Sequence, residues 1–159
     1  MASARLAGPD DVAFVRDATY AAYEAYLPVL GAMPLPVSAD HGADIAAGHV
    51  WLVSDAGVDA GLMVLEAAAD HLMIESLAVL PACQGRGLGR WMLGFAERKA
   101  RDAGLPELRL YTNALMARNI GIYQQAGFVE TGRQAVPHRP DIIRVYMAKL
   151  LGRSGLHLL

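Results

Sequence analysis

The chain has 159 residues, of which 54% are hydrophobic and 19% charged, and its net charge is −2. This composition excludes a disordered chain, and the scattered charges provide no basic stripe for nucleic acid. No apolar run reaches the roughly 18 residues of a membrane span, the first residues lack the apolar core of a signal peptide, and the single cysteine, Cys83, excludes an internal disulfide. We therefore expect one cytoplasmic domain over residues 1–151, followed by a tail at 152–159.

The first half of the chain predicts a short strand, two helices and three strands joined by hairpin turns. For the first helix, Asp10 is the expected N-cap and Pro28 the expected end. An irregular stretch follows it up to residue 40. In chain order the predicted elements are a strand at 4–6, helices at 11–27 and 40–47, and strands at 49–54, 61–65 and 72–80.

The second half predicts an amphipathic helix, a strand, a short helix and two final strands. Gly104 and Gly127 are placed to end the two helices. In chain order the predicted elements are a helix at 88–103, a strand at 108–111, a helix at 119–125, and strands at 128–133 and 142–150. Hairpin turns early and a β-α-β crossover later predict an α/β (α+β) fold with a mixed sheet, antiparallel at first with a parallel pair in its middle.

A glycine-rich run, Gln84-Gly85-Arg86-Gly87-Leu88-Gly89, lies between a predicted strand and the amphipathic helix. The N–H groups of a first helical turn lack intrahelical partners and lie at the positive end of the helix dipole, so the run predicts an anion site. A P-loop would need Lys-Ser or Lys-Thr after the last glycine, and a dinucleotide fingerprint would need a third glycine at Arg90 or Met92. Both registers fail, and the glycines could instead serve only close packing of strand and helix.

Two segments give this chain its resemblance to a family. Leu77-Ala78-Val79-Leu80-Pro81 with Gln84–Gly89 resembles the Q-x-x-G-x-G acyl-CoA motif of the GNAT superfamily of N-acetyltransferases. The segment from Asn119 to Phe128 resembles the family's N-x-x-x-Y-x-x-x-G-F pattern. The resemblance covers about residues 4–150 and implies a central mixed sheet flanked by helices. It also implies acetyl-CoA as co-substrate and direct transfer of its acetyl group to a primary amine.

The resemblance assigns roles to individual residues. Backbone N–H groups of Leu77, Ala78 and Val79 would pair with the pantetheine arm, and that of Val79 would polarise the thioester carbonyl. Tyr123 would protonate the departing thiolate, although a purely packed aromatic is the other interpretation. The remaining cofactor contacts would be the pyrophosphate loop, its two arginines and the start of the later helix: Gln84, Gly85, Arg86, Gly87, Leu88, Gly89, Arg90 and Asn119, the last also a predicted N-cap.

The acceptor side is less defined. Glu75 shares a strand face with Leu77 and is a candidate general base, while Tyr23 and Tyr26 are candidate acceptor contacts. The acceptor, expected to be an amine of a small molecule or of a protein, would meet residues 20–40 and 134–141. The histidines show no metal-ligand spacing, so no metal is expected. A homodimer is one expectation from the family, and a non-catalytic acyl-CoA-binding module on the same fold is the alternative function.

Overall fold

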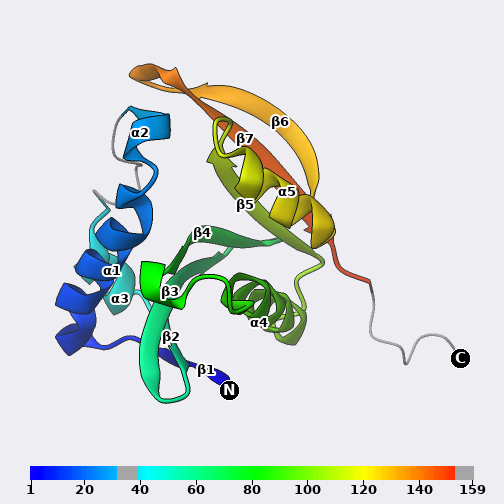
Figure 1. Ribbon diagram of the computed structural model, residues 1–159. Helices are drawn as coiled ribbons and strands as arrows, with labels where there is room; N and C mark the ends of the chain where they lie inside the picture. The colour runs from blue at the N-terminus through cyan, green and yellow to red at the C-terminus, as the bar shows by residue number, and fades with distance from the viewer. Residues whose placement is uncertain (32–38, 153–159) are drawn as a thin grey trace, which may run out of the picture. The chain divides into compact units, whose positions relative to one another are not determined.

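A computed structural model describes residues 1–31 and 39–152 (Figure 1). The chain divides into two compact units, the first made of Met1–Glu66 with Glu75–Met92 and the second of Ala67–Ile74 with Leu93–Leu159. Hydrogen bonding orders seven strands as β1-β2-β3-β4-β5-β7-β6. No helix within the described ranges is long and apolar enough to cross a membrane. The predicted mixed sheet flanked by helices is confirmed.

The first unit begins with an antiparallel β1-β2-β3 meander. The turn between β2 and β3 uses Ala56 (φ 52°) and Gly57 (φ 80°), a left-handed pair that suits a two-residue hairpin. The elements of this unit are β1 (Ala2–Leu6), α1 (Val12–Glu24), α2 (Leu27–Leu30), α3 (His41–Ala46), β2 (Val50–Asp55), β3 (Val58–Ala67), the C-terminal part of β4 (Leu72–Val79) and the start of α4 (Leu88–Asp102).

One face of these strands packs against α1 and α3. The buried side chains come from both helices and from β2, β3 and β4, and Tyr23 packs against their edge. Burial of this apolar surface is the main force that holds the helices on the sheet. The buried members of this core are Val15, Ala18, Ala22, Ile45, Val50, Leu52, Leu62, Val64 and Ala78.

A β-bulge in β3 lies at the point where this strand faces the end of β4. Gly61 pairs with Val53 and Asp59 pairs with Ser54, so Ala60 is the extra residue. The Ala60 carbonyl accepts a hydrogen bond from the Leu80 N–H at 2.8 Å. The bulge therefore lies beside the chain segment that leads from β4 into the glycine-rich run.

The second unit pairs the first residues of β4 with β5 in parallel and continues with antiparallel strands. The parallel register runs from Leu72↔Leu108 to Ile74↔Leu110. The helix α4 ends in a Schellman motif, in which Gly104 (φ 72°) donates to Arg101 and Leu105 donates to Ala100. The further elements of this unit are β5 (Glu107–Asn113), α5 (Ala117–Gln125), β6 (Val129–Val136) and β7 (Arg139–Leu150).

Two predicted helix boundaries near the N-terminus are wrong. Asp10 is not an N-cap, because it lies inside a 3-10 helix (Pro9–Asp11) whose N-cap is Gly8, and Asp11 is the N-cap of α1. The Asp11 carboxylate accepts the Gly8 N–H at 2.8 Å. Helix α1 ends at Glu24, and Pro28 lies in the first turn of α2, where a missing N–H costs nothing. Most of the predicted irregular stretch and of the tail, residues 32–38 and 153–159, lie outside the described residues.

Candidate functional site

The glycine-rich run forms an exposed turn between a 3-10 helix (Pro81–Cys83) and α4. Gly85 has φ 80° and Gly87 has φ 79°, both in the left-handed region that side chains rarely adopt. A Cβ built on Gly85, Gly87 or Gly89 would meet no atom within 4 Å. Gly85 and Gly87 are therefore required by backbone conformation, and none of the three glycines is required by close packing of the strand on the helix.

The residue that precedes α4 has no side chain. The Trp91 N–H donates to the Gly87 carbonyl at 3.0 Å, so the residue that precedes the helix is a glycine. A serine, threonine or aspartate at this position would satisfy one of the N–H groups of the first turn, whereas glycine has no side chain to do so. The amides and the helix dipole together favour a bound anion here.

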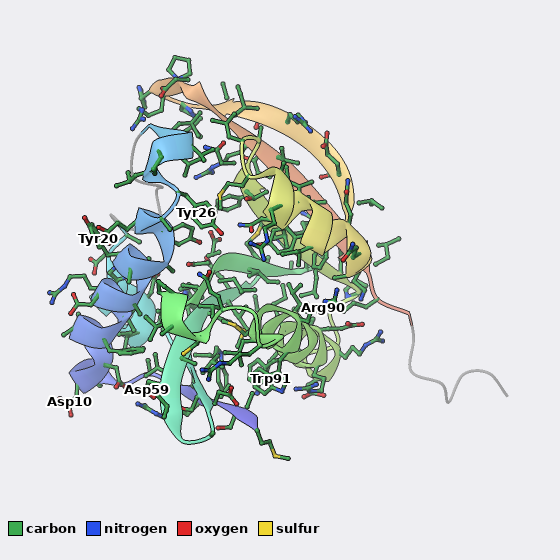
Figure 2. All side chains as sticks on the ribbon, viewed as in Figure 1. Asp10, Tyr20, Tyr26, Asp59, Arg90 and Trp91 are labelled. Atoms are coloured by element: carbon green, nitrogen blue, oxygen red, sulfur yellow. The ribbon has the colours of Figure 1, made fainter. Side chains whose placement is uncertain are left out.

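Two arginines flank this turn. Arg86 is exposed and lies 4.0 Å from Asp55, the last residue of β2. Arg90 is exposed in the first turn of α4, and its side chain leaves the helix on a different side from that of Trp91 (Figure 2). An exposed pair at 4.0 Å is weak, so a phosphate can replace Asp55 as the partner of Arg86 at little cost.

The Gln84 side chain connects the turn to the strand before it. Its Nε2 donates to the Val79 carbonyl at 3.3 Å, and its backbone N–H points at the Pro81 carbonyl at 3.4 Å. The glutamine of the motif thus fixes the end of β4 relative to the glycine-rich turn. This contact holds the expected pyrophosphate and pantetheine segments in one arrangement within the first unit.

Strand β4 separates its side chains by alternation, as the sequence predicts. Glu75, Leu77 and Val79 are half-buried on one face, whereas Ser76 and Ala78 are buried on the face that packs against α1. Glu75 and Leu77 do share a face, as expected from their spacing. The role of Glu75 as general base stays a prediction.

Tyr23 reaches β4 from helix α1. Burial raises the pKa of Tyr23, and this rise is opposed by polar contacts with Ser76 and with the Leu77 backbone, while nearby Tyr26 adds to it. The Ser76 Oγ is buried and makes no hydrogen bond of ordinary geometry within the described part of the chain, so its contact with the Tyr23 hydroxyl is a loose one. Tyr20, on α1, is 45% exposed and points away from Tyr26, which lies between α1 and α2 (Figure 2).

Ser76 was not among the predicted site residues, although the sequence contained a signal for it. In a strand with alternating burial, a serine at a core-facing position needs a polar partner. The charged residue of the same strand, Glu75, lies on the opposite face. The structure therefore adds one polar atom to the Tyr23 side of β4.

In the second unit, Asn119 and Tyr123 lie one turn apart on α5 and share a helix face. The predicted N-cap role of Asn119 is wrong, because the helix begins at Ala117 and Met116 precedes it. The Asn119 amide lies 4.0 Å from the Met116 sulfur. The half-buried Tyr123 ring contacts Phe128 edge-on, with ring centres 6.1 Å apart, so part of its role is packing.

Cys83 and the histidines add no metal chemistry within residues 1–31 and 39–152. No group of three or more metal-binding side chains occurs there. Cys83 is buried in the 3-10 turn that precedes Gln84.

Comparison with known proteins identifies the chain type. A family model described as an acetyltransferase (GNAT) domain matches residues 46–130. An IAA acetyltransferase of Azospirillum brasilense is 31% identical over 94 residues, which are 59% of this chain and 61% of that protein. The chain thus matches less than two thirds of the length of this relative.

Solved structures support the same fold. A GNAT-family acetyltransferase from Desulfovibrio desulfuricans superposes with a TM-score of 0.77 at 18% identity, covering 96% of this chain and 100% of that one. The PaiA N-acetyltransferase from Thermoplasma acidophilum, solved with coenzyme A, gives a TM-score of 0.76 at 14% identity, covering 95% and 99%. From its family-model match, which includes the glycine-rich turn and Tyr123, the chain belongs to the GNAT acetyltransferase family.

Proposed function

We propose that this protein transfers the acetyl group of acetyl-CoA to a primary amine. The observation that carries the proposal is the glycine-rich turn. Two left-handed glycines lead into the N-terminus of α4 in a chain of the GNAT family. Backbone amides of Gly85–Gly89 would bind the pyrophosphate, with Arg86 and Arg90 adding charge-assisted hydrogen bonds.

The remaining donor contacts follow from β4. Backbone groups of Leu77–Val79 would pair with the pantetheine arm as an added strand does, and the Val79 N–H would donate to the thioester carbonyl oxygen. This hydrogen bond would stabilise the negative charge that develops on the oxygen. The contact between Gln84 and the Val79 carbonyl supports the proposal, because it fixes the strand end beside the turn.

The chemistry would proceed by direct attack in a ternary complex. The neutral amine nitrogen forms a bond to the carbonyl carbon, the C–S bond breaks, and the sulfur takes a proton from the Tyr123 hydroxyl. The proton that the nitrogen loses on becoming an amide returns to the Tyr123 oxygen, directly or through water. The proton that the acceptor ammonium must lose first would pass to Glu75, directly or through water. Tyr23 and Tyr26 would contact the acceptor.

Two solved relatives support acetyl-CoA as the donor. The PaiA structure contains coenzyme A. A streptothricin acetyltransferase from Bacillus anthracis was solved with acetyl coenzyme A. Its fold is similar to that of this chain, with a TM-score of 0.60 at 19% identity over 65% of this chain and 62% of that one. The acceptor of this chain is a small-molecule or protein amine in the proposal.

The test measures thiol release from acetyl-CoA with a panel of amines. We expect turnover with at least one amine, and we expect Tyr123→Phe to lower kcat about 100-fold while the dissociation constant of CoA stays nearly unchanged. Tyr20→Phe is the matched control, because Tyr20 is exposed on α1 and should keep wild-type kcat. An unchanged kcat in Tyr123→Phe would remove the acid role. Tight CoA binding without turnover of any amine would favour the non-catalytic module.

A further inference from the structure

Tyr23 connects helix α1 to one edge of β4. Its side chain packs against the core that α1 and α3 form with the strands. Its hydroxyl contacts the Ser76 side chain and the Leu77 backbone. All three residues belong to the first unit, which also contains the glycine-rich turn. This polar contact therefore lies in the same unit as the turn and the strand end that are proposed to bind acetyl-CoA.

The Leu77 N–H points to the edge of β4 that faces away from β3. The Leu80 N–H donates to the Ala60 carbonyl of β3 at 2.8 Å. The N–H groups of successive residues in a strand point to opposite edges, so the Leu77 N–H, an odd number of residues earlier, points away from β3. On that side the parallel register with β5 runs from Leu72 to Ile74, and Leu77 lies beyond it. This N–H therefore lies outside the strand pairing of the described residues and needs another acceptor.

The Tyr23 oxygen is the acceptor of this N–H. Burial raises the pKa of Tyr23, and the contacts with Ser76 and with the Leu77 backbone oppose this rise. A hydrogen bond opposes it only when it is donated to the tyrosine oxygen, because such a bond stabilises the charged form. The backbone group of Leu77 in this contact is therefore its N–H. The same N–H is one of the groups that the proposed function assigns to the pantetheine arm.

The Ser76 hydroxyl offers Tyr23 a second hydrogen-bond partner. Ser76 is only 8% exposed, and its Oγ makes no hydrogen bond of ordinary geometry in the part of the chain that the structure describes. A buried polar atom rarely stays without a partner, because nothing then replaces the water that it lost. An unused partner beside the Tyr23 hydroxyl is explained if the hydroxyl turns to Ser76 when another group takes the Leu77 N–H.

We propose that the Tyr23 hydroxyl holds the Leu77 N–H in the free protein and exchanges it for Ser76 when the pantetheine arm binds. A carbonyl oxygen of the arm then accepts the Leu77 N–H, and the Tyr23 O–H donates to the Ser76 Oγ. The inference rests on the proposed function, because the arm of acetyl-CoA displaces the hydroxyl. Tyr23 is thus a positioning residue that keeps this edge of β4 hydrogen-bonded until the arm arrives. Its oxygen can still accept a hydrogen bond from the acceptor amine.

The test is a double-mutant cycle on CoA binding, measured by calorimetry for wild type, Tyr23→Phe, Ser76→Ala and the double variant. Ser76→Ala should raise the dissociation constant of CoA about 3- to 10-fold, because the displaced hydroxyl loses its second partner. In the Ser76→Ala background, Tyr23→Phe should lower this constant about 3- to 10-fold, because CoA no longer has to displace a hydroxyl. A tyrosine that only packs, or that contacts CoA directly, would not produce this reversal.

Two controls locate the effect at the pantetheine arm and at Leu77. The ligand 3′-phospho-ADP contains the pyrophosphate of CoA and no pantetheine arm, so its dissociation constant should stay within about twofold in all variants. In the free protein, Tyr23→Phe should speed hydrogen exchange of the Leu77 amide at least about tenfold relative to the Leu52 amide of β2, because the Leu77 N–H loses its acceptor. Tyr20→Phe is the matched variant, since Tyr20 is 45% exposed on α1 and should change neither quantity. Melting temperatures of all variants would verify folding.

The outcomes separate the exchange from the proposed transfer. If Tyr23→Phe weakens CoA binding or leaves it unchanged in the Ser76→Ala background, the exchange is overturned and the acetyltransferase proposal stands. Equal changes for CoA and 3′-phospho-ADP would also overturn the exchange, because the effect would not depend on the arm. The expected cycle without turnover of any amine would support the exchange and overturn the transfer. If wild type does not bind CoA, both proposals are wrong.

Discussion

Gly61 provides a sharp test of how closely β3 approaches β4. A Cβ added at this position would lie 2.2 Å from the Ala78 carbonyl oxygen and 3.2 Å from the Val79 Cα. A carbon and a carbonyl oxygen normally come no closer than about 3.3 Å, so Gly61→Ala requires a backbone shift of about 1 Å. Both contacting atoms are backbone, and no side-chain rotation can relieve the clash.

The expected cost follows from this geometry. Overpacking of this kind lowers the free energy of unfolding by about 1–3 kcal/mol, which for a chain of this length lowers the melting temperature by about 3–10 °C. The shift falls on Ala78 and Val79, whose backbone is proposed to contact the thioester. Because a displacement of about 1 Å can reduce a rate 100-fold, we expect kcat/KM for acetyl-CoA to fall about 10- to 100-fold.

The assay combines thermal melting with thiol-release kinetics for wild type, Gly61→Ala and a matched control. Gly132→Ala is that control, because Gly132 also lies in a strand, β6, and a Cβ there meets no atom within 4 Å. The control should change stability by less than about 1 kcal/mol. If Gly61→Ala melts within about 2 °C of wild type and retains its kcat/KM, the strands can separate at no cost and the reasoning is refuted.

Two further predictions concern the glycine-rich turn and the α4–β7 contact. Gly87→Ala should raise the dissociation constant of CoA at least tenfold in calorimetry and lower the free energy of unfolding by about 1–2 kcal/mol. Gly57→Ala is the matched control, because Gly57 has a similar left-handed φ and equally open surroundings. It should lose the same stability and keep the CoA affinity. The pKa of Glu97 lies below its usual value of 4.5, because hydrogen bonds from Arg101 and Lys149 outweigh the raising effect of burial. The stability that Glu97 contributes is therefore present above about pH 4.5 and lost as the pH falls through the folded-state pKa. Urea unfolding should show Glu97→Gln to be about 0.5–1 kcal/mol less stable than wild type at pH 7 and equal to it near pH 3; a constant difference across this range would contradict the ion-pair origin.

The order and type of the elements could be predicted from the sequence because each has a local cause. Alternation in β4, the apolar stripe of α4 and the terminating glycines 104 and 127 depend on neighbouring residues only. The predicted helix start was wrong where a competing local hydrogen bond determined where the helix begins. The Asp11 carboxylate accepts the Gly8 N–H and closes a 3-10 helix before α1, so Asp10 lies inside that turn and Asp11 is the N-cap of α1.

Long-range contacts could not be predicted from the sequence. Neither the bulge at Ala60 nor the contact of Gly61 with Ala78 has a signature in the β3 sequence, because both depend on the pairing partner. The contact of Tyr23 with Ser76 joins residues 53 positions apart, and helical spacing alone could not distinguish Tyr23 from the exposed Tyr20.

The proposed donor site and the proposed acceptor site differ in how well the sequence predicts them. The proposed donor contacts are made mainly by the backbone, and backbone recognition requires glycines at fixed positions, here with φ near 80° at Gly85 and Gly87. Such a requirement leaves a motif that can be identified without a structure. The proposed acceptor contacts, Tyr23 and Tyr26, are side chains whose positions in the sequence fit simple packing equally well, and no motif marks them. A donor site built from backbone can thus stay constant while the acceptor changes by single side-chain substitutions, so the glycine-rich turn should identify the proposed donor and not the acceptor.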